Sequence, residues 1–462
     1  MVNLRSSSTM SGAIDDRMLR TFAGSLTGQA LLPGDQGYEQ ARHVFNAMID
    51  RRPAVIVRCA GQDDVRRGVD FARSHGLPLS IKGGGHSVAG NAVCDGGIML
   101  DLSGMKGIRV DPAMQIAVAQ PGLTLAELDR ATQAHGLATP LGIVSVTGIA
   151  GLTLGGGLGW LNGKHGLACD NLLAAEVVTA DGQVQTASET ENADLLWTLR
   201  GGGGNFGVVT SFTYRLHPVA TVLAGALTFP AERAAEAMRF YHEFSGSAPD
   251  ELSSAGMIAS DGAGHAVFGV ALCYCGEIAE GERALRPLRA FGPPSEDTVG
   301  PMEYCAFQSG GDGGFPEGRQ HYWKASFLNE LSDDVIDVLL DHAARMPSSF
   351  SAVGLQQMSG VASRIDPQAT AFAHRARQYD CNILAQWQDP GDSPANITWV
   401  REFFTALEPF AERSVYANNL GDEGEERVRA AYGANYERLA SLKAKYDPTN
   451  LFRMNQNVTP AR

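Results

Sequence analysis

The sequence lacks features that would indicate a membrane protein or a nucleic-acid-binding protein. Its 462 residues contain no run of about 18 apolar residues, the length that a membrane-spanning helix requires. Lys and Arg number 37 against 51 Asp and Glu, giving a formal net charge of −14. Nucleic acids and anionic membrane surfaces both favour clustered positive charge. We therefore expect small-molecule partners, with no nucleic acid and no membrane.

Cysteine is sparse, and its pattern excludes a complete disulfide framework. The seven cysteines are odd in number and form no C-x-x-C pair. The first residues, 1–8, lack the apolar core of a signal peptide. We therefore expect a cytoplasmic protein.

Metal-binding motifs are also missing. There is no H-E-x-x-H motif, and the Cys273-x-Cys275 pair lies in a strand pattern that favours two buried thiols. The sequence predicts no metal site.

Length and patterning predict an α+β protein of several folding units. A hydrophobic content of 44% is ample for a buried core. After an N-terminal arm over residues 1–29, residues 30–218 alternate strand and helix patterns. Residues 219–415 combine short alternating strands with amphipathic helices, which predicts an antiparallel platform covered by helices. Residues 416–462 contain one helix over about 425–445 and a tail that returns to the first domain.

The most informative segment is the glycine-rich loop at residues 82–90, Lys-Gly-Gly-Gly-His-Ser-Val-Ala-Gly. Strand patterns over 54–57 and 79–81 flank a helical pattern over 63–76, so a βαβ unit delivers this loop. Successive glycines allow positive φ and leave backbone N–H groups bare. The loop therefore predicts an anion site suited to a pyrophosphate.

Two other nucleotide motifs fail on their surroundings. The segment 202–207 matches G-x-G-x-x-G, but a helical pattern precedes it and a strand pattern follows it, which reverses the dinucleotide-binding order. The segment 159–165 is one residue short of a P-loop and lacks the Ser or Thr that would hold magnesium. Neither motif supports a nucleotide-dependent dehydrogenase or an ATPase.

Four segments, 82–90, 148–160, 170–182 and 199–210, together with the tail at 446–458, resemble the FAD-linked oxidases of the vanillyl-alcohol oxidase and p-cresol methylhydroxylase (PCMH) superfamily, in the berberine bridge enzyme-like branch. The resemblance implies a PCMH-type FAD-binding domain of two subdomains over 30–218, a substrate domain over 219–415 and a C-terminal berberine-bridge-like segment over 416–462. It implies hydride transfer from a small organic alcohol or amine, such as a secondary metabolite or sugar, to flavin N5. Molecular oxygen would then reoxidise the flavin and yield hydrogen peroxide.

The resemblance also implies how FAD is held. His86 would bond covalently through a ring nitrogen to the 8α-methyl carbon of the flavin, which requires a neutral imidazole and raises the flavin's reduction potential. Relatives often have a cysteinyl second link where this chain has Val144, so a single link is expected. Thr147 stands where relatives control oxygen access, and its small side chain favours an oxidase. The full set of cofactor-binding residues implied is Lys82, Gly83, Gly84, Gly85, His86, Ser87, Gly90, Thr147, Gly148, Gly151, Leu152, Thr153, Gly156, Gly157, Gly159, Trp160, Asn205, Gly207, Val208, Val209, Asn455 and Asn457.

The catalytic base is the point where the chain departs from these relatives. They often carry Tyr-x-Asn-Tyr and use the last tyrosine as the base, whereas this chain ends the motif with Asn419, which has no titratable proton. Tyr416 keeps its place and is predicted to line the cavity. Tyr322 and Lys324 share one face of a strand, and a phenol beside an ammonium has a lowered pKa, so they are candidates for the base. The alternatives are a packing Tyr322 with a surface Lys324, or an amine substrate that needs no base.

Two other functions fit the same residues. A dehydrogenase on this fold would pass electrons to a quinone or a protein instead of oxygen. The missing tyrosine at Asn419 also fits a flavin-loaded binding protein without turnover.

Overall fold

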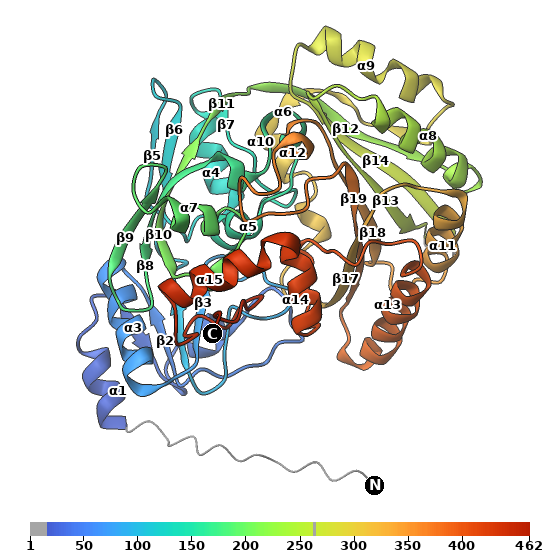
Figure 1. The fold of residues 1–462 in the computed structure, drawn as a ribbon. Helices are drawn as coiled ribbons and strands as arrows, with labels where there is room; N and C mark the ends of the chain where they lie inside the picture. The colour runs from blue at the N-terminus through green and yellow to red at the C-terminus, as the bar shows by residue number, and fades with distance from the viewer. Residues whose placement is uncertain (1–15, 262–264) are drawn as a thin grey trace.

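The computed structural model describes residues 16–261 and 265–462, and two sheets form the centre of its N-terminal half (Figure 1). The arm expected over residues 1–29 lies outside the described residues as far as residue 15. It continues as α1 (Asp16–Ala23), whose Leu19 and Phe22 are buried against the first sheet.

The first sheet has the strand order β1-β2-β4-β3. Its strands are β1 (Gln29–Leu31), β2 (Val55–Arg58), β3 (Leu79–Lys82) and β4 (Ile98–Asp101). The predicted βαβ unit is confirmed, because α3 (Gln62–His75) connects β2 to β3 and both strands pair in parallel with β4. The helix buries Val65, Val69 and Ala72 and ends at Gly76, whose φ of 63° suits glycine. The loop that carries His86 begins where β3 ends.

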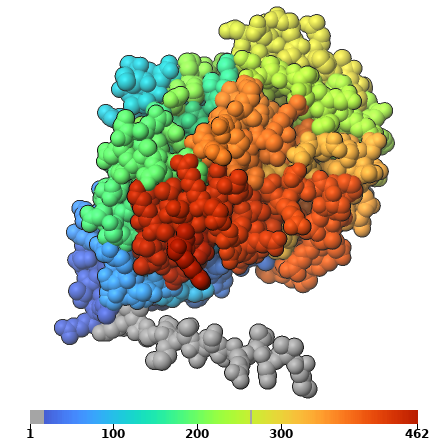
Figure 2. Space-filling view, viewed as in Figure 1, coloured from blue at the N-terminus to red at the C-terminus, as the bar shows by residue number. Residues whose placement is uncertain are grey.

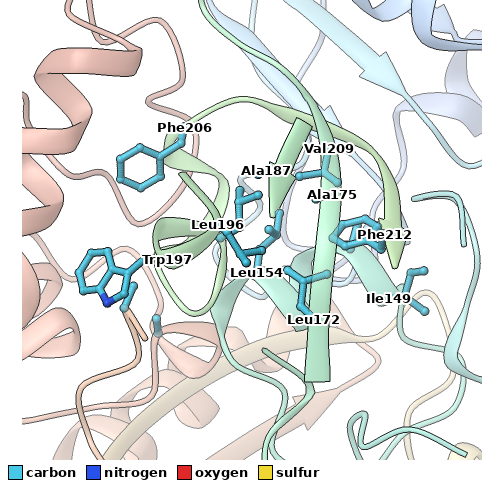
Figure 3. Packing of buried hydrophobic residues seen from close by; sticks show 14 of the residues in the cluster. Ile149, Leu154, Leu172, Ala175, Ala187, Leu196, Trp197, Phe206, Val209 and Phe212 are labelled. Atoms are coloured by element: carbon cyan, nitrogen blue, oxygen red, sulfur yellow. The ribbon is translucent and has the colours of Figure 1, made fainter. Parts of the chain in front are cut away.

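The second sheet is antiparallel, with the strand order β5-β6-β10-β8-β9. Its strands are β5 (Ile108–Asp111), β6 (Ile116–Ala119), β8 (Leu172–Val178), β9 (Val184–Ser188) and β10 (Val208–Arg215). The helices α4 (Leu125–Gln133), α5 (Ile149–Gly155) and α7 (Ala193–Leu199) contribute to its core, and Figure 3 shows residues of α5, α7, β8 and β10 packed together there. The capping box predicted at Thr124 and Glu127 is present at the start of α4. The structure confirms that a helix, α7, precedes the glycine segment 202–207 and that a strand, β10, follows it. This order is the reverse of a dinucleotide-binding motif.

A larger antiparallel sheet forms the other half of the molecule. Its order is β15-β12-β14-β13-β18-β19-β17, with β16 paired to β12. The strands are β12 (Thr221–Phe229), β13 (Leu252–Ser260), β14 (Ala266–Tyr274), β15 (Glu296–Asp297), β16 (Gly300–Glu303), β17 (Gln320–Leu328), β18 (Ala352–Met358) and β19 (Gln378–Trp387). The helices α8 (Ala234–Gly246), α9 (Ile278–Ala290), α11 (Asp333–Ala343) and α13 (Ser393–Leu407) lie on its outer side (Figure 1). The predicted strand platform covered by helices is confirmed, and its inner face is left to line a cavity.

The C-terminal segment differs from its prediction in one respect. Instead of one helix over 425–445, the chain forms α14 (Glu425–Tyr432) and α15 (Tyr436–Tyr446), separated by a short turn. Gly433 has a φ of 51°, which a continuous helix cannot contain, so the single-helix prediction was wrong. α15 packs against α7, and Figure 2 shows this segment covering part of the N-terminal half.

Short elements complete the described chain. They are α2 (Tyr38–Arg42), β7 (Leu137–Ala138), which pairs with β11 (His217–Pro218), α6 (Asn162–His165), α10 (Tyr304–Ser309) and α12 (Gly360–Arg364). Within residues 16–261 and 265–462, no helix is long and apolar enough to cross a membrane.

Candidate active site

A cavity of about 360 Å³ lies between the glycine-rich segments of the N-terminal half and the inner face of the large sheet. Residues from several regions line it, among them the loop after β3, the segment leading into α5 with α5 itself, the glycine segment before β10, strands β13, β17, β18 and β19, and the C-terminal segment. Of the residues expected to bind the cofactor, those lining it are Gly83, Gly84, Gly85, His86, Ser87, Thr147, Gly148, Gly151, Leu152, Gly207, Val209 and Asn455. Tyr416, Asn419 and Val144 line it as well.

Glycines shape the cavity wall in two different ways. Gly84 and Gly148 cross so closely that a Cβ on Gly84 would lie 2.5 Å from the backbone nitrogen of Gly148. Side chains at either position would force the two segments apart. Gly151 also lines the cavity, but a Cβ there would meet no described protein atom within 4 Å. The absence of a side chain at Gly151 therefore leaves open space in the cavity. A bound flavin would need such space.

His86 lines this wall with a neutral imidazole ring. Its Nε2 is buried and makes no hydrogen bond within the described chain. Burial lowers the pKa of His86 to about 4, so the imidazole is unprotonated at neutral pH. An unprotonated and unpartnered ring nitrogen is the form that can act as a nucleophile.

Among the described residues, Asp380 is the one buried carboxylate at the cavity. It was not identified as a site residue from the sequence. Asn419 donates a hydrogen bond of 2.6 Å from Nδ2 to Oδ2 of Asp380. Oδ1 of Asp380 is buried and has no partner in the described chain. Burial raises the pKa of Asp380 to about 7. Asp380 and Asn382 line the cavity from one face of β19, and two polar residues at alternate positions in an apolar strand were the available signal.

Tyr416 lines the cavity as predicted, although its hydroxyl already has partners. The hydroxyl oxygen accepts hydrogen bonds from the backbone N–H of Gly157 at 2.8 Å and from Nδ2 of Asn418 at 2.7 Å. Burial raises the pKa of Tyr416, which keeps the phenol neutral. The Tyr416 hydroxyl therefore connects the segment after α5 to residues 416–419.

Tyr322 and Lys324 share a face of β17, as predicted, but that face turns away from the cavity. The Tyr322 hydroxyl accepts a hydrogen bond from Arg401 of α13, and Lys324 pairs with Glu423 at 2.7 Å. Trp323, on the opposite face, lines the cavity instead. The predicted base candidates Tyr322 and Lys324 therefore miss the cavity by one position of strand alternation.

The remaining expected cofactor residues do not line the cavity. Lys82 donates to the carbonyls of Ala41 and His43, and the Thr153 hydroxyl bonds to that of Tyr214 at 2.8 Å. Asn205 joins the C-terminal tail by accepting from the N–H of Val458. The others that do not line the cavity are Gly90, Gly156, Gly157, Gly159, Trp160, Val208 and Asn457.

A buried ion pair fixes the C-terminal tail beside the cavity. Lys443 donates to Asp447 at 2.7 Å and to the carbonyls of Asn205 and Phe452, and both charged side chains are fully buried. The two oxygens of Asp447 accept the N–H groups of Leu451 and Phe452. This arrangement brings Asn455 to the cavity. No cluster of metal-ligating side chains occurs in the part of the chain that the structure describes.

Comparisons with known proteins agree with this site. Residues 53–188 match the FAD binding domain family, and residues 415–459 match the berberine and berberine-like family. An FAD-linked oxidoreductase of Dictyostelium discoideum is 32% identical over 449 residues, covering 96% of this chain and 97% of the relative. The (R)-6-hydroxynicotine oxidase of Paenarthrobacter nicotinovorans is 30% identical over 451 residues, covering 94% and 97%.

Solved structures show the same fold. The 6-hydroxy-D-nicotine oxidase of Arthrobacter nicotinovorans superposes with a TM-score of 0.88 at 29% identity, covering 95% of this chain and 99% of that one. Berberine bridge enzyme, at 20% identity, matches in fold with a TM-score of 0.87 over 96% of this chain and 98% of that one.

Fold and site together define an FAD-linked oxidoreductase of the PCMH-type fold. Within that class, the chain belongs to the berberine bridge enzyme-like family.

Proposed function

We propose that the protein is an oxidase that takes a hydride from a small organic alcohol or amine and passes the electrons to molecular oxygen, forming hydrogen peroxide. Bound FAD would supply the hydride-accepting N5, and His86 would hold it through a single covalent link. Val144 stands at the cavity where a cysteinyl second link would need a thiol. The relative named (R)-6-hydroxynicotine oxidase supports oxidase chemistry on a small molecule, and the small side chain of Thr147 lines the cavity.

The observation that carries the proposal is the hydrogen bond between the buried Asp380 and the partly buried Asn419. Asn419 holds one carboxylate oxygen of Asp380 by a hydrogen bond and leaves the other without a protein partner. Loss of hydride from a carbon that bears a hydroxyl or ammonium group requires a nearby group to accept a proton. With a pKa of about 7, Asp380 can accept that proton at neutral pH. Asn419, which lacks a proton to exchange, therefore serves by orienting Asp380.

The cavity walls favour a compact substrate with an apolar body. Trp323, Phe315, Leu384 and Met257 provide apolar surface, and the indole Nε1 of Trp323 is buried without a partner in the described chain. A substrate that offers an acceptor to this N–H and a donor to Asp380 would satisfy both groups. Because about 360 Å³ must hold the flavin ring as well, a small molecule fits better than an extended chain.

Anaerobic rapid mixing tests the proposal. We expect at least one compact alcohol, amine or phenolic compound to bleach the flavin absorbance, and air to restore it with one hydrogen peroxide per flavin. The rate of bleaching should rise with pH through about 7 as Asp380 loses its proton. Asp380→Asn should lower that rate by roughly 10²–10⁴-fold and flatten this pH dependence. Asp129→Asn alters a buried carboxylate outside the cavity and should leave the rate unchanged.

Two results would favour the other functions. Slow reoxidation by air with fast reoxidation by an artificial dye would indicate a dehydrogenase. A flavin that no compound in the panel bleaches would indicate a binding protein without turnover.

A further inference from the structure

A short segment joins the His86 loop to the large sheet. We call residues 41–47 the strap. The N–H of Phe45 donates to the carbonyl of Gly85 at 3.0 Å, and the N–H of Ala47 donates to the carbonyl of Arg319 at 2.9 Å. The ammonium group of Lys82 fixes the start of the strap by donating hydrogen bonds to the carbonyls of Ala41 and His43. The strap is therefore bonded to both sides of the cavity.

Asn46 strengthens this connection from a buried position. Its Nδ2 donates to the carbonyl of Val88 at 2.8 Å and to that of His321 at 3.0 Å, while its Oδ1 accepts the N–H of His321 at 3.0 Å. Every polar atom of this amide is used, so Asn46 fixes the strap relative to both the loop after β3 and β17.

The ring of Phe45 lies between two imidazoles. Its centroid is 3.8 Å from that of His86, with 17° between the ring planes, and 4.1 Å from that of His321, with 25° between the planes. Trp323 meets Phe45 edge-on at 6.0 Å. Phe45 is 6% exposed, so its ring has little freedom to move. The plane of the His86 imidazole is therefore set by a ring that the strap holds rigidly.

We propose that Phe45 is a positioning residue for the covalent attachment of FAD to His86. The loop of Gly83, Gly84 and Gly85 has little side-chain packing of its own to orient the following histidine. The flat contact with Phe45 restricts rotation of the imidazole and keeps the ring in one plane at the cavity wall. This inference rests on the covalent link proposed above.

The attachment step shows why orientation matters. A bond would form between a ring nitrogen of His86 and the 8α-carbon of the flavin, while one C–H bond of the methyl group would break. The methyl group and the imidazole each lose one proton, and two electrons pass through the ring to molecular oxygen. Oxygen takes up the electrons and the two protons and becomes hydrogen peroxide. A bond-forming step between two held groups is sensitive to misplacement on the scale of 1 Å.

The test measures attachment itself. Freshly purified protein is incubated with FAD in air, samples are precipitated in acid at intervals, and the pellet's flavin absorbance and intact mass give the covalent fraction. Phe45→Leu and Phe45→Met remove the ring, and Met is included because its length and flexibility fill the space better. We expect both variants to attach FAD at least about tenfold more slowly while total flavin before precipitation stays near one per chain. Phe45→Tyr keeps the ring and should restore the wild-type rate.

The control is a stacked phenylalanine–histidine pair remote from the cavity. Phe403 lies 4.7 Å from His342 with 10° between the ring planes, and Phe403→Leu should not change the attachment rate. Wild-type attachment rates in both ring-less Phe45 variants, or an equal slowing in Phe403→Leu, would overturn the role of Phe45. A wild-type protein that carries no covalent flavin would instead contradict the link on which the inference rests.

Discussion

Several residues at the cavity carry a buried polar atom that has no partner in the described chain. They are Nε2 of His86, Nε1 of Trp323 and the Oδ1 atoms of Asp380, Asn382 and Asn455. Burying a polar atom without a hydrogen bond is unfavourable, so such atoms collect where a ligand completes them. Such atoms also occur away from the cavity, and Asp129 is one case: it is buried in α4, and neither of its oxygens has a partner in the described chain.

Asp129 should therefore make stability depend on pH. Burial raises its pKa well above the ordinary value, so the folded protein keeps a proton that the unfolded chain releases above about pH 4. The free energy of unfolding should fall as pH rises from there to the folded pKa, by up to about 1.4 kcal/mol per pH unit. Asp129→Asn cannot ionise and should lose this slope, as urea unfolding at several pH values between 5 and 9 would show.

Asp63→Asn, at an exposed position of α3, is the control and should keep the wild-type slope. If Asp129→Asn also kept it, the carboxyl of Asp129 would have to be ionised in the folded state.

Residues in a compact motif could be predicted, whereas residues that act through distant contacts could not. His86, Gly84 and Thr147 reach the cavity because they lie in glycine-rich segments whose spacing is distinctive. Asp380 and Phe45 have no such neighbours in the sequence. Asp380 acquires its raised pKa from a strand buried along its whole length, and Phe45 meets His86 only after the chain has folded across 41 positions.

At the scale of elements, the structure differs from the sequence predictions in two places. These are the face of β17 that meets the cavity and the break between α14 and α15. Alternation correctly put Tyr322 and Lys324 on one face, but the pattern does not state which face meets the cavity. Packing against α13 settles that choice, since Arg401 and Phe404 contact the two residues. Similarly, the helical pattern ran through Gly433 because glycine does not interrupt a pattern of apolar spacing, although its positive φ ends the helix.

The α15 element depends on the Lys443–Asp447 pair. Lys443→Met would leave the buried Asp447 carboxylate without its counter-charge, and breaking such a pair costs about 3–5 kcal/mol. We expect that loss in the free energy of unfolding measured with urea, and partial recovery in the double variant Lys443→Met, Asp447→Asn.

Lys445 offers a matched control on the same helix. Its side chain is 56% exposed and pairs with Asp194, so Lys445→Met should lower the free energy of unfolding by no more than about 1 kcal/mol. Equal losses of unfolding free energy in Lys443→Met and Lys445→Met would show that burial does not make the Lys443–Asp447 pair more important for stability than the exposed pair.

At the scale of the whole molecule, the cavity lies where the two halves and the C-terminal segment meet. Residues of the N-terminal half, the large sheet and the C-terminal segment all line it. In His86→Ala the flavin would be free to dissociate, so the thermal midpoint should rise with added FAD, by the equivalent of about 2.7 kcal/mol when FAD is 100 times its dissociation constant. Differential scanning fluorimetry over a series of FAD concentrations would measure this rise.

Wild-type protein with a saturated covalent link should show a thermal midpoint independent of added FAD. A dependence as steep as that of His86→Ala would mean that the wild-type flavin exchanges freely.

The position of Met454, Asn455 and Gln456 at the cavity has a consequence for biogenesis. A ribosome must finish nearly the whole described chain before these three residues emerge, so the growing polypeptide has no complete enclosure to offer a flavin. We therefore expect cofactor loading only after these residues have joined the cavity, and any truncation that removes residues 454–456 should leave a colourless product even though the glycine-rich loop is intact.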